Sequence, residues 1–167
     1  MRLLVIRHGV AGDRDEFAFT GRPDAERPLT KEGRVKMKRA AAGIRLVVDE
    51  LTLIATSPLV RAVQTAEIVA AATEFRGRMP ATDVLVPEAS ASDVVALLAK
   101  IADEKSVALV AHEPILSAVA AALTRKGRYP ALRKAEALRI RLPDGPEAGG
   151  SLRWRVDGGT GKRERLR

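Results

Sequence analysis

The chain has 167 residues, 46% of them hydrophobic and 30% charged, a balance that predicts one globular domain with a substantial core and argues against disorder. It contains no cysteine, which excludes disulfides, thiolate metal sites and cysteine nucleophiles. Its formal net charge of +8 favours anionic partners such as phosphate esters, phosphoproteins or nucleic acid.

The first half of the chain alternates short apolar runs with segments of helical period. The apolar run from Leu3 to Ile6 predicts a strand over residues 2–7, and a polar loop follows it. Thr30 is expected to cap a helix whose apolar stripe is spaced three and four residues apart. Residues 52–56 predict a second strand. Ser57-Pro58 then opens another helix, with serine as the cap and proline in the first turn.

The second half continues the alternation. A short strand is expected at 83–86, followed by a helix over roughly 92–102 with its apolar residues on one face. Residues 106–111 predict a buried strand, and Pro114 opens the helix after it. Two late strands flank a Pro/Gly-rich turn and predict an antiparallel hairpin, at about 135–142 and 151–156.

The order of these elements indicates a three-layer α/β/α sandwich. The expected sheet has about six mostly parallel strands and ends in the C-terminal antiparallel hairpin. We expect a single domain over residues 1–157 and a basic, flexible tail over 158–167, because a Gly-rich stretch leads into a run of charges.

The N-terminal apolar run is too short for a membrane span or a signal-peptide core. Only four strongly apolar residues precede Arg7. We therefore expect a cytoplasmic protein without a membrane partner.

Both histidines of the chain follow predicted buried strands. His8 stands at the end of the 2–7 run, and His112 stands at the end of the 106–111 run. Ligands of open α/β sheets bind at the carboxyl ends of strands, and histidine is suited to nucleophilic or acid–base chemistry near neutral pH. Either histidine could instead be a buried structural residue, so the neighbouring residues decide between these interpretations.

Those neighbours fit phosphoryl transfer. A phosphoryl group in transit spreads negative charge over its oxygens, so catalysis depends on positioning and positive charge. Arg7 and Arg61 provide planar guanidinium forks for phosphate, and Arg61 lies one turn into its predicted helix. One neutral imidazole could attack phosphorus while the other donates to an oxygen.

The chain resembles the histidine phosphatase superfamily from residue 2 to about residue 142. Its SixA-type phosphohistidine phosphatase branch is the most similar. The motifs that carry this resemblance are Arg7-His8-Gly9, Ser57-Pro58-x-x-Arg61 with Gln64-Thr65-Ala66, His112 within Val110-Ala111-His112-Glu113-Pro114, and Pro28-Leu29-Thr30-x-x-Gly33.

The resemblance implies a role for each residue of these motifs. His8 is the nucleophile that becomes phosphohistidine, and Arg7, Arg61 and His112 complete the phosphate pocket. Gly9 and Ser57 support the pocket, Gly9 by letting the backbone turn sharply beside the nucleophile. No metal and no cofactor are expected.

The general acid is the least defined part of the site. Larger members of the superfamily hold an acid in an insertion between the second and third strands, and here the stretch 74–82 is short. Glu88 is the best candidate, while Asp15 and Glu16 in the 10–28 loop are alternatives. Glu88 could equally be a surface carboxylate.

The sequence thus predicts a metal-independent phosphatase that works through a phosphohistidine intermediate. A phosphohistidine-carrying protein is the first substrate class, since a site without a large insertion suits a side chain displayed on a protein. Alternatives are a small phosphate ester (sugar phosphate, nucleotide or polyphosphate) or a non-catalytic phosphate-binding module. Nucleic acid is disfavoured as a partner because aromatic residues make up only 3% of the chain and offer no stacking platform.

Overall fold

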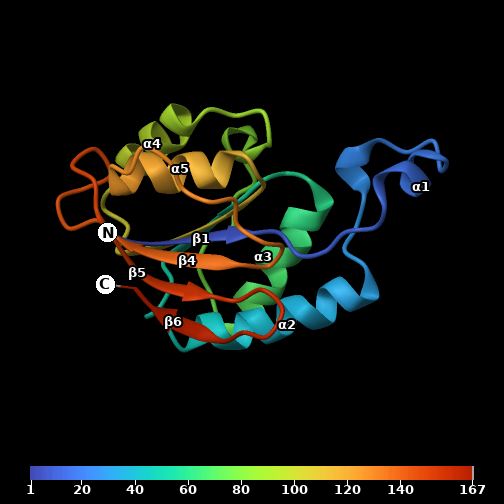
Figure 1. Cartoon of the computed structure of the whole chain (residues 1–167), viewed down its shortest axis with the longest axis horizontal. Coiled ribbons are helices and arrows are strands. Elements are labelled where there is room, and N and C mark those ends of the chain that lie inside the picture. Colours follow the sequence, from blue (N-terminus) through green and yellow to red (C-terminus); the bar gives the residue numbers. More distant parts are fainter. Residues whose placement is uncertain (167) are drawn as a thin grey trace.

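A six-stranded sheet forms the centre of the computed structural model, which describes residues 1–166 (Figure 1). The strand order is β2-β3-β1-β4-β5-β6. The strands are β1 (Arg2–Arg7), β2 (Leu53–Thr56), β3 (Ser106–Ala111), β4 (Ala137–Arg141), β5 (Ser151–Val156) and β6 (Arg163–Arg165). The strands β2, β3 and β1 pair in parallel, and each later strand pairs antiparallel to its neighbour.

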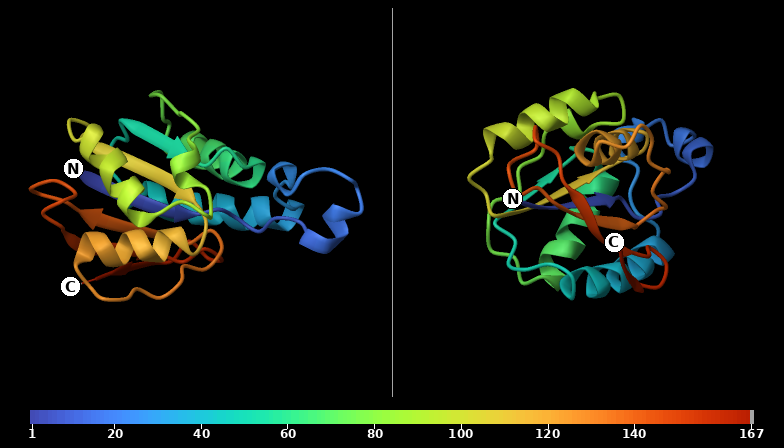
Figure 2. Two further views of the ribbon diagram at one scale, coloured as in Figure 1. Left: turned by 90° about the horizontal axis from the view of Figure 1, so that it is seen from above. Right: turned by 60° about the vertical axis from the view of Figure 1, so that its left-hand side comes forward.

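Helices cover both faces of this sheet, so the α/β/α sandwich is confirmed. One face is covered by α2 (Lys31–Arg45) and α3 (Val60–Ala72), and the other by α4 (Ala91–Lys100) and α5 (Ile115–Thr124) (Figures 1 and 2). Successive residues of β1 point to opposite faces: Leu3 packs on the α4/α5 side and Leu4 on the α2/α3 side. The two-sided burial explains why this strand is a continuous apolar run in the sequence.

The helix starts follow side-chain capping where the sequence offers it. The Thr30 hydroxyl accepts a hydrogen bond from Gly33 N at 2.8 Å, which confirms the expected cap of α2. Ser90 does the same for α4 through Asp93 N at 3.1 Å. The prediction that Ser57 caps the next helix is wrong, because α3 begins at Val60 and Leu59 occupies the cap position.

The expected strand at 83–86 is also wrong, because Asp83–Leu85 form a 3-10 helix, η2, that the Thr82 side chain caps. The residues just before it take the free edge of β2 instead: Thr56 N donates to Pro80 O, and Thr82 N donates to Thr56 O. Leu85 is then buried under α4 instead of extending the sheet.

The expected flexible tail over 158–167 is corrected in part by the structure. Residues 163–165 form β6, which pairs with β5 from Trp154 to Val156. The turn before β6 lies tightly against α2, since a Cβ on Gly161 would stand 2.2 Å from Arg39 O. Arg167 lies outside the described residues. No helix among residues 1–166 is long and apolar enough to cross a membrane.

The polar 10–28 loop contains two short helices that the sequence patterns did not indicate. These are α1 (Arg14–Ala18) and the 3-10 helix η1 (Asp24–Glu26). Figures 1 and 2 show that α1 extends beyond the carboxyl end of β1, away from the helical layers. This segment therefore flanks the edge of the sheet where both histidines lie.

Candidate active site

His8 directly follows β1 and is buried, with 3% of its surface exposed. Its backbone N donates to Ala111 O, so the β1–β3 pairing continues to the nucleophile candidate. The ring Nδ1 lies 2.7 Å from Gly9 O. A carbonyl oxygen can only accept, so Nδ1 carries the proton and Nε2 is unprotonated and holds a lone pair.

His112 follows β3 and faces His8. The two ring centroids are 4.8 Å apart, with an angle of 56° between the planes. The Nε2 of His112 is 2.8 Å from the Ser57 hydroxyl. Ser57 thus supports the site by holding the His112 ring. This contact, and not helix capping, explains why a serine stands at this position.

Both imidazoles are held in the neutral form. Burial, followed by the positive charges of Lys134 and the neighbouring groups, lowers the pKa of His8 from 6.5 to about 2. Burial and the Arg61 charge lower the pKa of His112 to about 3. A neutral His8 keeps its Nε2 lone pair at neutral pH, as a nucleophile requires.

Arg61 lies in the first turn of α3, where it is buried beside Asp24 of η1. One guanidinium nitrogen donates to Asp24 O at 3.0 Å, and the other is 3.2 Å from the Asp24 carboxylate. The Nε of Arg61 is buried without a hydrogen-bond partner among the described residues. The Nε of Arg7 is in the same state, although Arg7 also donates to Leu132 O at 2.5 Å.

Asp24 is an ionised carboxylate in this arrangement. A hydrogen bond from Arg27, together with the Arg61 and Arg14 charges, lowers the pKa of Asp24 below its usual range. It therefore balances charge at the site and holds no proton to donate at neutral pH.

Lys134 is the functional residue that the sequence patterns missed. Its ammonium nitrogen is 3.2 Å from the unprotonated Nε2 of His8, the candidate nucleophile. Burial, followed by the Arg7 and Arg61 charges, lowers the pKa of Lys134 from 10.5 to about 8. The residue precedes β4, and the antiparallel pairing of Ile6 with Ala137 places this segment beside the end of β1.

A half-buried glutamate holds the segment before β4 in place. Glu113 accepts from Leu132 N at 2.8 Å through one oxygen and from the Ser117 hydroxyl at 2.7 Å through the other. Arg7 binds the carbonyl of the same Leu132. The backbone of Ala135 donates to His8 O at 3.1 Å, so the loop is fixed on both sides of Lys134.

Gly9 allows close packing against Leu29, and it does not make the sharp backbone turn that was expected. Its backbone lies outside the left-handed region, and an added Cβ would stand 3.2 Å from Leu29 Cδ2. The Gly9 N–H donates to the Thr65 hydroxyl at 3.0 Å, and that hydroxyl donates to Arg61 O at 2.8 Å. The Thr65 hydroxyl thereby joins the nucleophile loop to the first turn of α3.

The expected residues do not all converge. His8 and His112 are in contact, and the charges of Arg61 and Arg7 act on His112, so these four residues form one site. Glu88 is exposed and makes no hydrogen bond or ion pair with any residue from 1 to 166. Within the same range, no three His, Cys, Asp or Glu side chains are grouped to hold a metal ion.

Comparisons with known proteins agree with this geometry. Residues 3–83 match the model of the histidine phosphatase superfamily (branch 1). An uncharacterised protein of Picosynechococcus is 36% identical over 145 residues, which covers 84% of this chain and 85% of that protein. The fold is that of the protein histidine phosphatase SixA, solved in complex with tungstate, with a TM-score of 0.81, 22% identity and 95% and 97% of the two chains covered. The α-ribazole phosphatase of Shigella flexneri aligns with a TM-score of 0.68 and 17% identity over 92% and 95% of the two chains.

Proposed function

Since the chain belongs to the histidine phosphatase superfamily and is a phosphatase, we propose that it acts without a metal ion through a phosphohistidine formed on His8. The observation that carries this proposal is the unprotonated Nε2 of a neutral, buried His8, which accepts a hydrogen bond from the Lys134 ammonium at 3.2 Å. A lone pair next to a positive charge is the arrangement that attack on a phosphoryl group requires.

The first step forms a bond between His8 Nε2 and phosphorus and breaks the bond from phosphorus to the leaving group. The leaving group departs with the electron pair and takes up a proton. The Nδ1 proton stays on the ring, where Gly9 O accepts its hydrogen bond and stabilises the positive charge of the phosphorylated imidazole. Water then attacks phosphorus, the N–P bond breaks, and His8 returns to its neutral form with release of inorganic phosphate.

Positive groups around His8 suit the charge of the transferred phosphoryl group. The buried Nε atoms of Arg7 and Arg61 have no partner among residues 1–166, and phosphoryl oxygens would satisfy them. A phosphate dianion also raises the pKa of a neighbouring imidazole, because it offsets the Arg61 charge that, after burial, lowers the pKa of His112. The neutral ring of His112 already carries one N–H donor, and the bound phosphoryl group favours the protonated ring, which donates from both nitrogens.

The first substrate class is a phosphohistidine carried on a protein. Its support is the likeness of the fold to SixA and the position of α1 beyond the sheet edge, with Phe19 at its end 92% exposed. A labile phosphorylated imidazole also makes little demand on a general acid. A small phosphate ester is the second candidate, since the α-ribazole phosphatase of Shigella flexneri shares the fold.

Glu88 remains our candidate for the proton donor to the leaving group. It follows η2 and lies in the connection that precedes α4. Its exposed carboxyl would have to meet the leaving group at the mouth of the site.

The decisive experiment is detection of the intermediate. We expect hydrolysis of phosphohistidine and of an aryl phosphate to resist EDTA, and a rapid alkaline quench to trap on the wild-type enzyme a labelled phosphoryl group that acid then releases. His8→Ala should abolish both turnover and the labelled intermediate. Wild-type turnover by His8→Ala would end the proposal, and kcat/KM across a panel of phosphohistidine proteins and phosphate esters would rank the substrate classes.

A further inference from the structure

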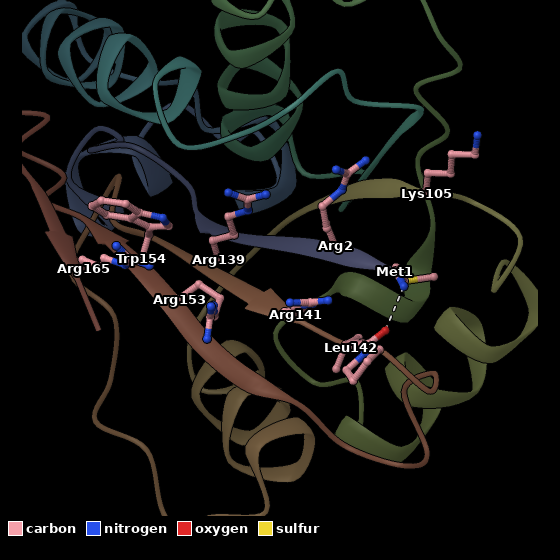
Figure 3. A pocket seen from close by; sticks show the side chains of 10 residues that line it. Met1, Arg2, Lys105, Arg139, Arg141, Leu142, Arg153, Trp154 and Arg165 are labelled. Carbon is pink, nitrogen blue, oxygen red and sulfur yellow. Dashed lines mark hydrogen bonds between the residues drawn. The ribbon is translucent and has the colours of Figure 1, made fainter. Parts of the chain in front are cut away.

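A second basic site lies at the opposite end of the sheet from the two histidines. A groove of about 800 Å³ lies there, lined by residues of β1, β4, β5 and β6 and by the residue before β3. Figure 3 shows its lining side chains. Its cationic side chains are Arg2, Lys105, Arg139, Arg141, Arg153 and Arg165. The strand β1 spans six residues, so the groove is roughly 20 Å from His8 at about 3.3 Å per residue.

The positive charges of this groove are poorly balanced. Asp49, in the loop after α2, lies 2.9 Å from Arg2 and 2.6 Å from Arg139. The four other cationic side chains make no ion pair with any residue from 1 to 166. Among residues 1–166, only the Asp49 carboxylate pairs with cations of the groove, and it contacts two of the six, which leaves a strong positive potential in a concave surface.

The strand pairing places two of these cations directly opposite each other. Arg2 of β1 and Arg141 of β4 are register partners. Like charges at opposite positions of an antiparallel pair destabilise the sheet, and Asp49 contacts only one of the two arginines. A bound anion would offset this repulsion.

The shape and the side chains of the groove select the class of anion. Guanidinium groups bind phosphate through two parallel hydrogen bonds, and the volume is that of a small-molecule site. Trp154 supplies the aromatic wall, but the Arg165 guanidinium already lies 6.0 Å from the centroid of its ring. A covered ring is a poor platform for the base stacking on which single-stranded nucleic acid binding depends.

We propose that this groove binds a compact small molecule carrying two or more phosphate groups, at a site separate from the catalytic one. The guanidinium groups of Arg141 and Arg153 provide unpaired donors for it, and Arg2 and Arg139 contribute charge that Asp49 neutralises in part. The ligand occupies the amino-terminal end of β1 while the substrate occupies its carboxyl end.

Titration calorimetry with inorganic tripolyphosphate tests the proposal in the His8→Ala variant, which cannot turn the ligand over at the catalytic site. We expect binding in this variant and a loss of affinity of about tenfold or more when Arg141→Gln and Arg153→Gln are added. Removing two exposed charges elsewhere, with Lys126→Gln and Arg128→Gln, is the matched control and should leave the affinity within about threefold.

Separate outcomes would overturn the proposal. Absence of tripolyphosphate binding at low salt excludes the site, and equal losses in the groove variant and the control variant reduce it to non-specific charge attraction. Orthophosphate that binds as tightly as tripolyphosphate, and loses the same affinity in the groove variant, excludes a multivalent ligand. A short single-stranded oligonucleotide that binds more tightly than tripolyphosphate, and loses affinity in the groove variant, assigns the groove to nucleic acid instead.

Two further measurements test whether the groove variant still folds and still has its phosphatase activity. The groove variant should keep the melting temperature of its parent or exceed it, because Arg141→Gln removes the repulsion of Arg2. The same two substitutions in the wild-type background should leave phosphatase kcat/KM unchanged. Failure of the groove proposal thus says nothing against the phosphohistidine mechanism.

Discussion

Replacing Lys134 by methionine should lower kcat/KM and change its pH dependence. The Lys134 ammonium is 3.2 Å from His8 Nε2, so it lies beside any phosphoryl group that forms on this atom. At about 4 Å and an effective dielectric constant near 20, two unit charges attract by about 4 kcal/mol. After desolvation, a hydrogen bond to a charged group contributes about 1.5–3 kcal/mol, which corresponds to a loss of roughly 10- to 150-fold.

The pH profile separates this role from a structural one. An ammonium group is charged below its pKa, and the pKa of Lys134 is about 8 in the empty site. The wild-type kcat/KM, which reports groups of the free enzyme, should therefore fall as the pH rises through about 8. Lys134→Met should be slow at every pH and lack this fall, whereas Lys134→Arg should keep its charge and a larger part of the rate at high pH.

Steady-state hydrolysis of an aryl phosphate from pH roughly 6 to 10 measures both effects. Lys126→Met, at an exposed position after α5, is the control for the loss of a lysine. If Lys134→Met kept the wild-type kcat/KM and the same alkaline decline, Lys134 would have no part in phosphoryl binding.

Three other substitutions test the surroundings of the site. A Cβ on Gly33 would stand 2.0 Å from Val10 O, so Gly33→Ala should destabilise the fold by about 1–3 kcal/mol in chemical denaturation, while Gly127→Ala, with open space around it, should not. Thr65→Val leaves the buried Gly9 N–H without an acceptor and should cost about 1–3 kcal/mol in the same assay; an unchanged midpoint would contradict the hydrogen bond. Glu88→Gln should lower kcat more for an alkyl phosphate than for an aryl phosphate, since only a poor leaving group needs a proton. Equal effects on both substrates would exclude Glu88 as the acid.

The sequence predicted the parts of the fold that depend on local pattern. Strands buried on both faces are uninterrupted apolar runs, so β1 and β3 and the histidines that follow them could be located. The Thr30 cap was visible because capping needs only a short polar side chain before an apolar period. The prediction of a strand at 83–86 is wrong because three apolar residues, Val84 to Val86, have too little periodicity to distinguish a strand from a buried turn.

The missed features depend on contacts between distant segments. Lys134 lies in a loop, and only the antiparallel pairing of β4 with β1 brings it back to His8. The local sequence predicts a helix cap at Ser57. Its hydrogen bond with His112, 55 positions away in the chain, has no local signal. The edge strand β6 is short and charged, which is typical of protected sheet edges and also of tails, so its residues alone could not decide.

The ion pair between Asp24 and Arg61 bears on how the enzyme empties its site after each reaction. When inorganic phosphate departs, the Arg61 guanidinium remains paired with a carboxylate 3.2 Å away and is not left as a bare buried charge. The empty state is thus lower in free energy than it would be without Asp24, and the affinity for the product is correspondingly weaker. An internal counter-ion of this kind favours release of inorganic phosphate and limits inhibition by accumulated product.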